Sequence, residues 1–286
     1  MNAARQITVF SHARPEETDD ALRHLIARAQ HHGITIRLDP DETRKHPSIA
    51  AGAGVLPDAE VTDEVSLAIA LGGDGTILRA LRRYAGTSVP VFGVNFGEVG
   101  FLSTIERDEA HDGFERALTG DFETLTLPAI AVEHPNGPHA AINDVAITRC
   151  AGERVAELAY FVGGEEVGRV RCDGLVVATP AGSTGYNLAN GGPVLAWGVE
   201  GFVVSFIAPH SLTARALVVA PDDVLSVHNR SHSAVDVSID GRPAGELGPG
   251  ETMTAGFLRE ATDLALLPGS SFYRRLREKF GKLASS

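Results

Sequence analysis

A short glycine-rich segment, Gly72-Gly73-Asp74-Gly75-Thr76, carries the residues best suited to chemistry in this sequence. It follows an apolar run and precedes a segment with helical spacing, so its backbone amides would lie at a helix N-terminus, where phosphate binds well. Glycines also let a ligand approach the backbone closely. The Walker pattern with its lysine is absent, so the carboxylate of Asp74 needs another explanation.

Three explanations for Asp74 remain open from these five residues alone. The carboxylate could accept a proton from an alcohol, or it could help to organise Mg²⁺ that bridges phosphate groups. Both roles suit phosphoryl transfer to a hydroxyl, in which positioning and charge neutralisation dominate. The third explanation is structural, with Asp74 capping the helix that follows it.

Three further segments combine glycine with polar side chains. The segment 93–102, GVNFGEVGFL, follows an expected strand and predicts either a ligand-binding loop or a structural loop. Asn143-Asp144 could bind the vicinal hydroxyls of a ribose, or could form an ordinary turn at the start of a strand. The segment 173–194 offers glycines, hydroxyls, amides and the ring of Tyr186, a set suited to a nucleotide.

The elements that must position these residues change in kind near residue 122. Before it, strands and helices alternate, which is the pattern of an α/β domain with a parallel sheet. One stretch, 40–64, is rich in Ala, Gly, Pro and acidic residues and is expected to be irregular. Strands are expected at 6–10, 34–39, 65–71 and 89–95, and helices at 15–33, 76–86 and 106–120. We therefore expect an N-terminal α/β domain over residues 1–122.

The second part, 123–267, lacks clear helical spacing and consists of short runs rich in β-branched residues. The sequences VGGEEVG and IDGRPAG predict hairpin turns between such strands. Many short strands with regular turns predict an all-β domain of two stacked antiparallel sheets. The chain ends in a basic helix, within 268–286, whose apolar side predicts that it returns to the first domain.

Composition excludes several classes of protein. The 286 residues carry a formal charge of −12, which argues against a nucleic-acid-binding surface. Two cysteines, Cys150 and Cys172, are too few for a disulfide scaffold, and a reducing cytoplasm is the expected location. No apolar run approaches the ~18 residues of a membrane-spanning helix, so no membrane partner is expected. The eleven histidines show no zinc-like spacing with the cysteines.

Taken in order, the motifs resemble those of the NAD kinase family. The resemblance runs from about Val65 to the end, through LGGDGT, GVNFGEVGFL, NDVAI, DGLVVATPAGSTGY, GGPV, APHSL and the closing SFYRRLREKF. The segment GGDGT alone is shared with lipid kinases, whereas the full ordered set is specific. The resemblance implies phosphorylation of the 2′-hydroxyl of the adenosine ribose of NAD, giving NADP, with ATP or polyphosphate as donor.

The resemblance also implies an N-terminal α/β nucleotide-binding domain and a β-rich NAD-binding domain over residues 123–267, and it implies roles for particular residues. Asp74 would accept the proton from the ribose hydroxyl. A divalent metal, normally Mg²⁺, would be required, although its ligands stay unknown. Family members are usually homodimers or homotetramers. The NAD site would comprise Asp74, Gly75, Arg79, Asn143, Asp144, Arg154, Arg171, Asp173, Thr184, Gly185, Tyr186, Asn187, Leu188 and Ala189.

The sequence departs from the family pattern at three places. The usual TPTGSTAY reads TPAGSTGY, with Ala181 and Gly185. Where many members have Asp-Gly-Gln, this chain has Asp240-Gly241-Arg242, so the glutamine contact to NAD is not carried over to Arg242. In relatives, a polar residue at the position of Arg171 tends to accompany a preference for NAD over NADH, and Arg171 predicts that preference here.

Two other functions are compatible with parts of this pattern. A lipid or sphingoid kinase would use the same GGDGT turn to bind ATP, but it needs a large apolar acceptor cleft, against which the polar loop GSTGYNLANGG argues. A nucleotide-sensing protein without activity would be expected to lack the acidic base, yet Asp74 is present.

Overall fold

The computed structural model describes residues 5–97 and 100–284. Glu98 and Val99, within the second glycine-rich motif, lie outside the described residues. Contacts divide the chain into two compact units, Met1–Thr126 with Thr262–Ser286, and Leu127–Ala261. Strands β7 (Glu123–His134) and β18 (Thr252–Leu266) have residues in both units. The domain boundaries expected at 122/123 and 267/268 stay a prediction.

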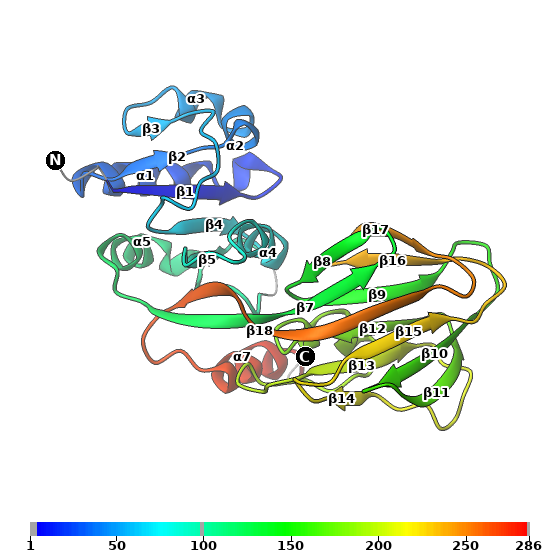
Figure 1. The fold of residues 1–286 in the computed structure, drawn as a ribbon. Helices are drawn as coiled ribbons and strands as arrows, with labels where there is room; N and C mark the ends of the chain where they lie inside the picture. The colour runs from blue at the N-terminus through cyan, green and yellow to red at the C-terminus, as the bar shows by residue number, and fades with distance from the viewer. Residues whose placement is uncertain (1–4, 98–99, 285–286) are drawn as a thin grey trace. The chain divides into compact units, whose positions relative to one another are not determined.

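The first unit contains a parallel sheet in the order β3-β2-β1-β4-β5, with β6 and the end of β18 paired to β5 (Figure 1). Every residue of β4 and β5 is buried, as expected for central strands of a parallel sheet. The strand bounds are β1 Gln6–Ser11, β2 Thr35–Arg37, β3 Val55–Leu56, β4 Ala68–Gly72, β5 Val91–Asn95 and β6 Ile105–Glu106. The predicted α/β alternation is therefore confirmed.

Helices of the first unit bury the faces that their spacing predicts. The helix α1 buries Leu22, Leu25, Ile26 and Ala29, and these side chains join a core that includes Phe114 of α5. An apolar residue at every third or fourth position places these side chains on one face. The helices are η1 Pro15–Glu17, α1 Asp19–His31, α2 Pro40–Lys45, α3 Pro47–Ala50, α4 Asp74–Arg83, η2 Arg107–Glu109, α5 Ala110–Thr119 and α7 Phe272–Ala284.

The expectation that residues 40–64 are irregular is wrong for part of this stretch. It contains α2, α3 and β3. The helix α2 forms because Asp39 accepts a hydrogen bond from the amide of Glu42 at 2.8 Å and Pro40 occupies its first turn. Pro47 likewise begins α3. Proline, usually read as a helix breaker, here marks two helix starts.

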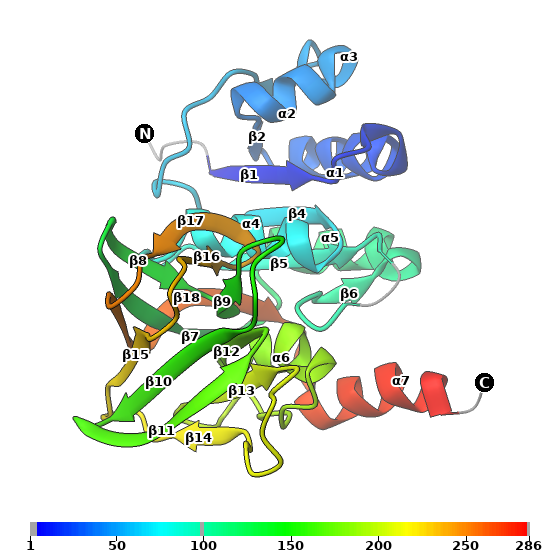
Figure 2. The ribbon, with the colours of Figure 1, turned by 90° about the vertical axis from the view of Figure 1, so that its right-hand side faces the viewer.

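The second unit consists mainly of antiparallel strands in two layers. One layer contains β11-β10-β15-β18 with β7 and β8, and the other has the order β14-β13-β12-β9-β16-β17 (Figure 2). One apolar core draws on both layers, with Leu158 and Val227 from the first and Val177 and Val204 from the second. Two stacked antiparallel sheets are thus confirmed. The bounds are β8 Gly137–Ala141, β9 Asp144–Arg149, β10 Ala156–Val162, β11 Glu165–Cys172, β12 Gly174–Ala178, η3 Gly182–Thr184, α6 Tyr186–Ala189, β13 Phe202–Ile207, β14 Leu217–Val219, β15 Leu225–Asn229, β16 Val235–Ile239 and β17 Arg242–Leu247.

The C-terminal helix α7 packs within the first unit, as predicted. Lys279 of α7 pairs with Glu106 at 2.8 Å, and the ring of Phe280 meets that of Phe101 edge to face. Both predicted hairpin turns are also present, and their central residues, Gly163-Gly164 and Asp240-Gly241, have positive φ. Within the part of the chain that the structure describes, no helix is long and apolar enough to cross a membrane.

Candidate active site

The glycine turn between β4 and α4 is shaped by close backbone packing. A side chain on Gly72 would come within 2.6 Å of Cβ of Thr76, and a Cβ on Gly97 would lie 3.3 Å from Cα of Gly73. Gly73 and Gly97 thus bring the two turns after β4 and β5 together at the carboxyl ends of these strands. Open α/β sheets bind ligands at this edge.

Asp74 does not cap helix α4. Gly73 occupies the capping position without a side-chain bond, and Asp74 is the first helical residue. Its carboxylate instead accepts hydrogen bonds from the amides of Phe101 at 2.9 Å and Leu102 at 3.1 Å. Burial raises the pKa of Asp74, while these two amides and the nearby Lys279 and Arg275 oppose that rise. The carboxylate is therefore fixed in direction and is a stronger base than an exposed aspartate.

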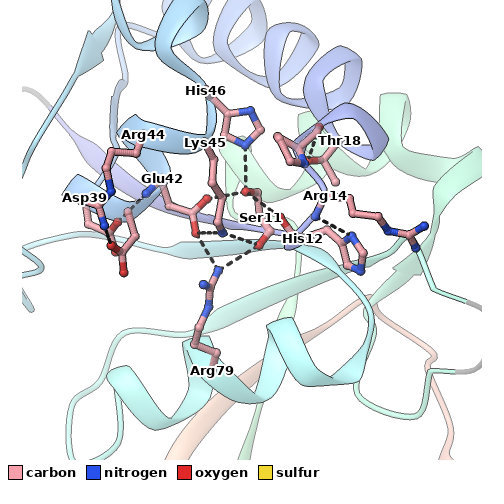
Figure 3. Close-up of polar contacts among 12 residues, drawn as sticks. Ser11, His12, Arg14, Thr18, Asp39, Glu42, Arg44, Lys45, His46 and Arg79 are labelled. Atoms are coloured by element: carbon pink, nitrogen blue, oxygen red, sulfur yellow. Dashed lines mark hydrogen bonds and ion pairs between the residues drawn. The ribbon is translucent and has the colours of Figure 1, made fainter.

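Arg79 lies on α4 within a polar cluster of the first unit (Figure 3). Its guanidinium donates to Glu42 at 2.7 Å and to the carbonyl of Ser11 at 3.0 Å. Glu42 is 1% exposed and also pairs with Lys45 at 2.9 Å, so one buried carboxylate is shared by two cations. Ser11 Oγ donates to Glu42 and lies 2.8 Å from Nε2 of His46. Sequence reasoning missed Glu42, which lies in the stretch expected to be irregular.

Asp144 is the first residue of β9 in the second unit, Asn143 directly precedes it, and Asp240 fixes the backbone of both. The carboxylate of Asp240 accepts from the amides of Ile142 at 3.2 Å, Asn143 at 2.7 Å and Asp144 at 3.2 Å. Asn143 Oδ1 is buried without a hydrogen-bond partner. Burial, together with the Asp240 charge, raises the pKa of Asp144 to about 6. A buried amide oxygen and a destabilised carboxylate are groups that a ligand with hydroxyls could satisfy.

The glycine-rich loop after β12 contacts the same pair. A Cβ on Gly182 would lie 2.0 Å from the carbonyl oxygen of Asn143, so a glycine is required at this position. The amide of Thr179 donates to that carbonyl at 2.9 Å, and its hydroxyl donates to the carbonyl of Ile142. Asn143-Asp144 and the loop 182–189 are therefore brought together.

Within this loop the predicted site residues differ in accessibility. Asn187 is fully buried, and its amide donates to the carbonyls of Ser183 and Pro193 at 2.9 Å each. Tyr186 beside it is 41% exposed and can stack on a base or ring. Thr184 and Leu188 are partly buried, and Gly185 and Ala189 are exposed. Asn187 thus holds the loop, while Tyr186 is presented to solvent.

Arginines gather around a solvent-accessible cavity of about 330 Å³ in the second unit. Arg154 and Arg171 line it, as do Arg149 and Arg230. Arg149 pairs with Asp173 at 2.8 Å. Among the described residues, Arg154, Arg171 and Arg230 have no carboxylate at ion-pair distance. Sequence reasoning named Arg154, Arg171 and Asp173 but missed Arg230, which no motif marks.

A divalent metal is implied by the family resemblance. Among the described residues, one group places three candidate ligand atoms within 4.8 Å of one another, namely Cys150, Asp236 and Glu246. Burial and the neighbouring acids raise the pKa of the Cys150 thiol, so it stays protonated. Mg²⁺ takes oxygen ligands. This group therefore does not fit Mg²⁺.

The predicted site residues divide between the two units. Asp74, Gly75 and Arg79 belong to the first unit, and those from Asn143 to Ala189 belong to the second. The first set includes a fixed carboxylate at the carboxyl edge of a parallel sheet, where α/β folds bind ligands. The second combines a buried amide oxygen, an exposed tyrosine ring and arginines that have no carboxylate at ion-pair distance among the described residues. These features together define the class as a nucleotide-dependent phosphotransferase.

Comparison with known protein families identifies the group within this class. Residues 40–122 match the ATP-NAD kinase N-terminal domain, and residues 142–256 match the ATP-NAD kinase C-terminal domain. The NAD kinase of Symbiobacterium thermophilum is 37% identical over 244 residues, which cover 82% of this chain and 86% of the relative. The NAD kinase of Gemmatimonas aurantiaca is 36% identical over 220 residues, covering 74% and 76%. The chain belongs to the NAD kinase family.

Solved structures agree with this fold. Yeast NADH kinase, in complex with NADH, superposes with a TM-score of 0.85 at 22% identity. The match covers 98% of this chain and 89% of the yeast chain. An NAD kinase from Archaeoglobus fulgidus, in complex with ATP, superposes with a TM-score of 0.70 at 25% identity and covers 98% and 99%. None of these matches supports the lipid or sphingoid kinase alternative.

Proposed function

We propose that this enzyme transfers a phosphoryl group from ATP or polyphosphate to the 2′-hydroxyl of the adenosine ribose of NAD, giving NADP. The observation that carries the proposal is the Asp74 carboxylate, which two backbone amides hold at the glycine turn after β4. Each carboxylate oxygen keeps a lone pair that can accept a proton. Membership of the NAD kinase family supports the same assignment.

In the proposed reaction, Asp74 accepts the proton from the ribose hydroxyl as its oxygen bonds to phosphorus. The bond from phosphorus to the leaving oxygen of the donor breaks in the same transfer. The amides at the start of α4 face the phosphate charge, because a helix N-terminus leaves its first N–H groups unpaired. Asn143 and Asp144 bind the ribose hydroxyls, and Tyr186 with the loop 184–189 contacts the base.

Arg154, Arg171 and Arg230 are proposed to neutralise phosphate charge on the dinucleotide. These three residues line one cavity, and their guanidinium groups have no carboxylate at ion-pair distance among the described residues. Arginine binds phosphate through two parallel hydrogen bonds, so unpaired guanidinium groups suit a diphosphate. Mg²⁺ is proposed to be held chiefly by donor phosphates, since the three-ligand group around Cys150 does not fit it.

Three further expectations belong to the same proposal, the first taken from the family resemblance and the other two from composition. The enzyme is expected to form a homodimer or homotetramer, to act in the cytoplasm, and to bind no nucleic acid or membrane. The net charge of −12 and the two free cysteines support the last two. Sedimentation of the purified chain would give the oligomeric state.

The test is direct. The purified chain is incubated with NAD, Mg²⁺ and either ATP or polyphosphate, and NADP is measured with an NADP-specific dehydrogenase. Asp74→Asn is expected to abolish turnover while NAD binding, measured by calorimetry, is largely kept. Asp112→Asn, an exposed change on α5, is the matched control. Full activity of Asp74→Asn would show that Asp74 is not the base, and NAD binding without NADP formation by the wild type would favour a sensor.

A further inference from the structure

The loop that follows β5 holds the carboxylate of Asp74. The amides of Phe101 and Leu102 each donate to one of its two oxygens. The side chains of Phe101 and Leu102 are buried, so apolar packing also holds this loop in place. The direction of the carboxylate thus depends on the position of a loop 27 and 28 residues further along the chain.

That loop is in turn held by one side chain of the C-terminal helix. Arg275 of α7 donates to the carbonyls of Phe101 at 3.4 Å, Thr104 at 3.5 Å and Ser103. Each of these carbonyls belongs to the segment whose amides bind Asp74. A guanidinium has five N–H donors in a fixed plane, which lets it join several carbonyls at once.

One helical turn further on, a second contact fixes the same region. Lys279 pairs with Glu106 at 2.8 Å, and Glu106 accepts from Nδ2 of Asn95 at 2.7 Å. Asn95 Oδ1 accepts from the amide of Gly97 at 2.9 Å. Since Gly97 packs on Gly73, the contacts of α7 reach both sides of the turn that carries Asp74.

We propose that Arg275 is a positioning residue for the catalytic base, because it fixes the loop whose amides orient Asp74. The proposal rests on the proposed function, in which Asp74 accepts the proton. Arg275 lies in the closing segment SFYRRLREKF, where sequence reasoning gave it no role, and its contacts join α7 to a loop about 170 residues earlier.

The charges around this contact give the proposal a measurable consequence. Burial raises the pKa of Asp74, whereas the two amides and the cations of Lys279 and Arg275 lower it. Around Arg275 the acidic groups are Asp74, Glu106, Glu278 and Glu109. Replacing Arg275 by a neutral residue removes a cation and loosens the amides, so the pKa of Asp74 should rise. A base with a higher pKa stays protonated to a higher pH, so the acid limb of the pH–rate profile should move upward.

The experiment compares Arg275→Met, Arg275→Lys and the wild type, with Arg277→Met, an exposed change on the same helix, as control. The acid limb of kcat/KM for NAD should move to higher pH in Arg275→Met, since this variant loses one of the cations that lower the pKa of Asp74 and loosens the two amides that bind its carboxylate. In Arg275→Lys, which keeps the charge, the limb should stay close to that of the wild type. The KM for NAD should change less than twofold, and Arg277→Met should match the wild type.

Amide hydrogen exchange provides a readout that does not depend on activity. Exchange at Phe101 and Leu102 should become faster in Arg275→Met and not in Arg277→Met. Should Arg275→Met fail to fold, Arg275→Gln takes its place in both measurements. An unmoved acid limb together with unchanged exchange would overturn the positioning role. A wild type that makes no NADP would refute the proposed function, and the exchange comparison would still decide whether Arg275 fixes this loop.

Discussion

Replacing Asp144 by asparagine should stabilise the enzyme while impairing its activity. Burial and the neighbouring Asp240 raise the pKa of Asp144 from 3.8 to about 6. The folded state therefore binds this proton more tightly than the unfolded state does. The resulting stabilisation is fully present below pH 3.8 and is lost as the pH rises through about 6. At neutral pH the ionised carboxylate lowers the free energy of unfolding.

The size of this effect follows from the two pKa values. The difference between 3.8 and about 6, at about 1.4 kcal/mol for each pH unit, corresponds to roughly 3 kcal/mol. Asparagine has nearly the same shape but no charge. Asp144→Asn should thus raise the free energy of unfolding at pH 7.5 by up to roughly 3 kcal/mol, and the gain should shrink toward zero near pH 4.

Urea denaturation at pH 4.5, 6.0 and 7.5 measures this pH dependence. The single tryptophan, Trp197, lies in the same unit as Asp144, so its fluorescence reports the relevant transition. Asp236→Asn, an exposed change on β16, is the control and should stay within about 0.5 kcal/mol of the wild type. At pH 4.5, where Asp144 is mostly protonated, Asp240→Asn should lower the free energy of unfolding, because it weakens the hydrogen bonds from three amides.

Two results would refute this reasoning. One is an Asp144→Asn variant that is no more stable than the wild type at pH 7.5. The other is a gain that is equal at pH 4.5 and pH 7.5, because a change unrelated to ionisation would not depend on pH. In the same variant, the KM for NAD should rise at least several-fold if Asp144 binds the ribose.

Further predictions concern the loop, the cluster and the arginines. Gly182→Ala should lower the free energy of unfolding by about 1–3 kcal/mol, measured by thermal melting, because the added methyl group would meet the carbonyl of Asn143. Gly185→Ala should melt like the wild type, because the nearest atom to its methyl group would lie 3.4 Å away. Equal melting of the two would contradict this packing. Glu42→Gln should lower the urea-derived free energy of unfolding by about 3–5 kcal/mol, since it leaves two partly buried cations without their carboxylate. Arg171→Gly should increase phosphorylation of NADH relative to NAD, and equal rates on both substrates in the wild type would refute the preference.

Local features of the fold could be predicted from sequence because their causes are local. The apolar run of β4, the glycine turn and the helical spacing of α4 follow one another directly, and each depends on neighbouring residues. The hairpin at Gly163-Gly164 is predictable for the same reason, since two residues with positive φ form the turn. The stretch 40–64, by contrast, is judged by its overall composition, and this average does not reveal that Asp39 and Pro40 together start α2.

Residues that act through distant contacts could not be predicted in this way. Asp240 binds amides 96 to 98 residues away, and nothing in the spacing of either segment indicates the contact. Arg230 reaches the arginine-lined cavity from the turn after β15, which carries no recognisable motif. Such pairings depend on how strands are ordered in the sheets, and strand order is a property of the whole fold.

Several features that destabilise the folded state lie at the proposed active site. Asn143 Oδ1 is buried without a partner, Asp144 lies against a second carboxylate, and Asp240 takes a left-handed backbone conformation with a φ of 48°. Each feature alone lowers stability, and a fold selected for stability only would replace them. Asp240 binds the amides of Asn143 and Asp144, so the three features lie together, and a ribose whose hydroxyls donate hydrogen bonds to the oxygens of Asn143 and Asp144 would explain why they occur there. The same reasoning applies to Asp74, because burial destabilises its charged form. The pKa of Asp74 is therefore raised, which makes the carboxylate a better proton acceptor.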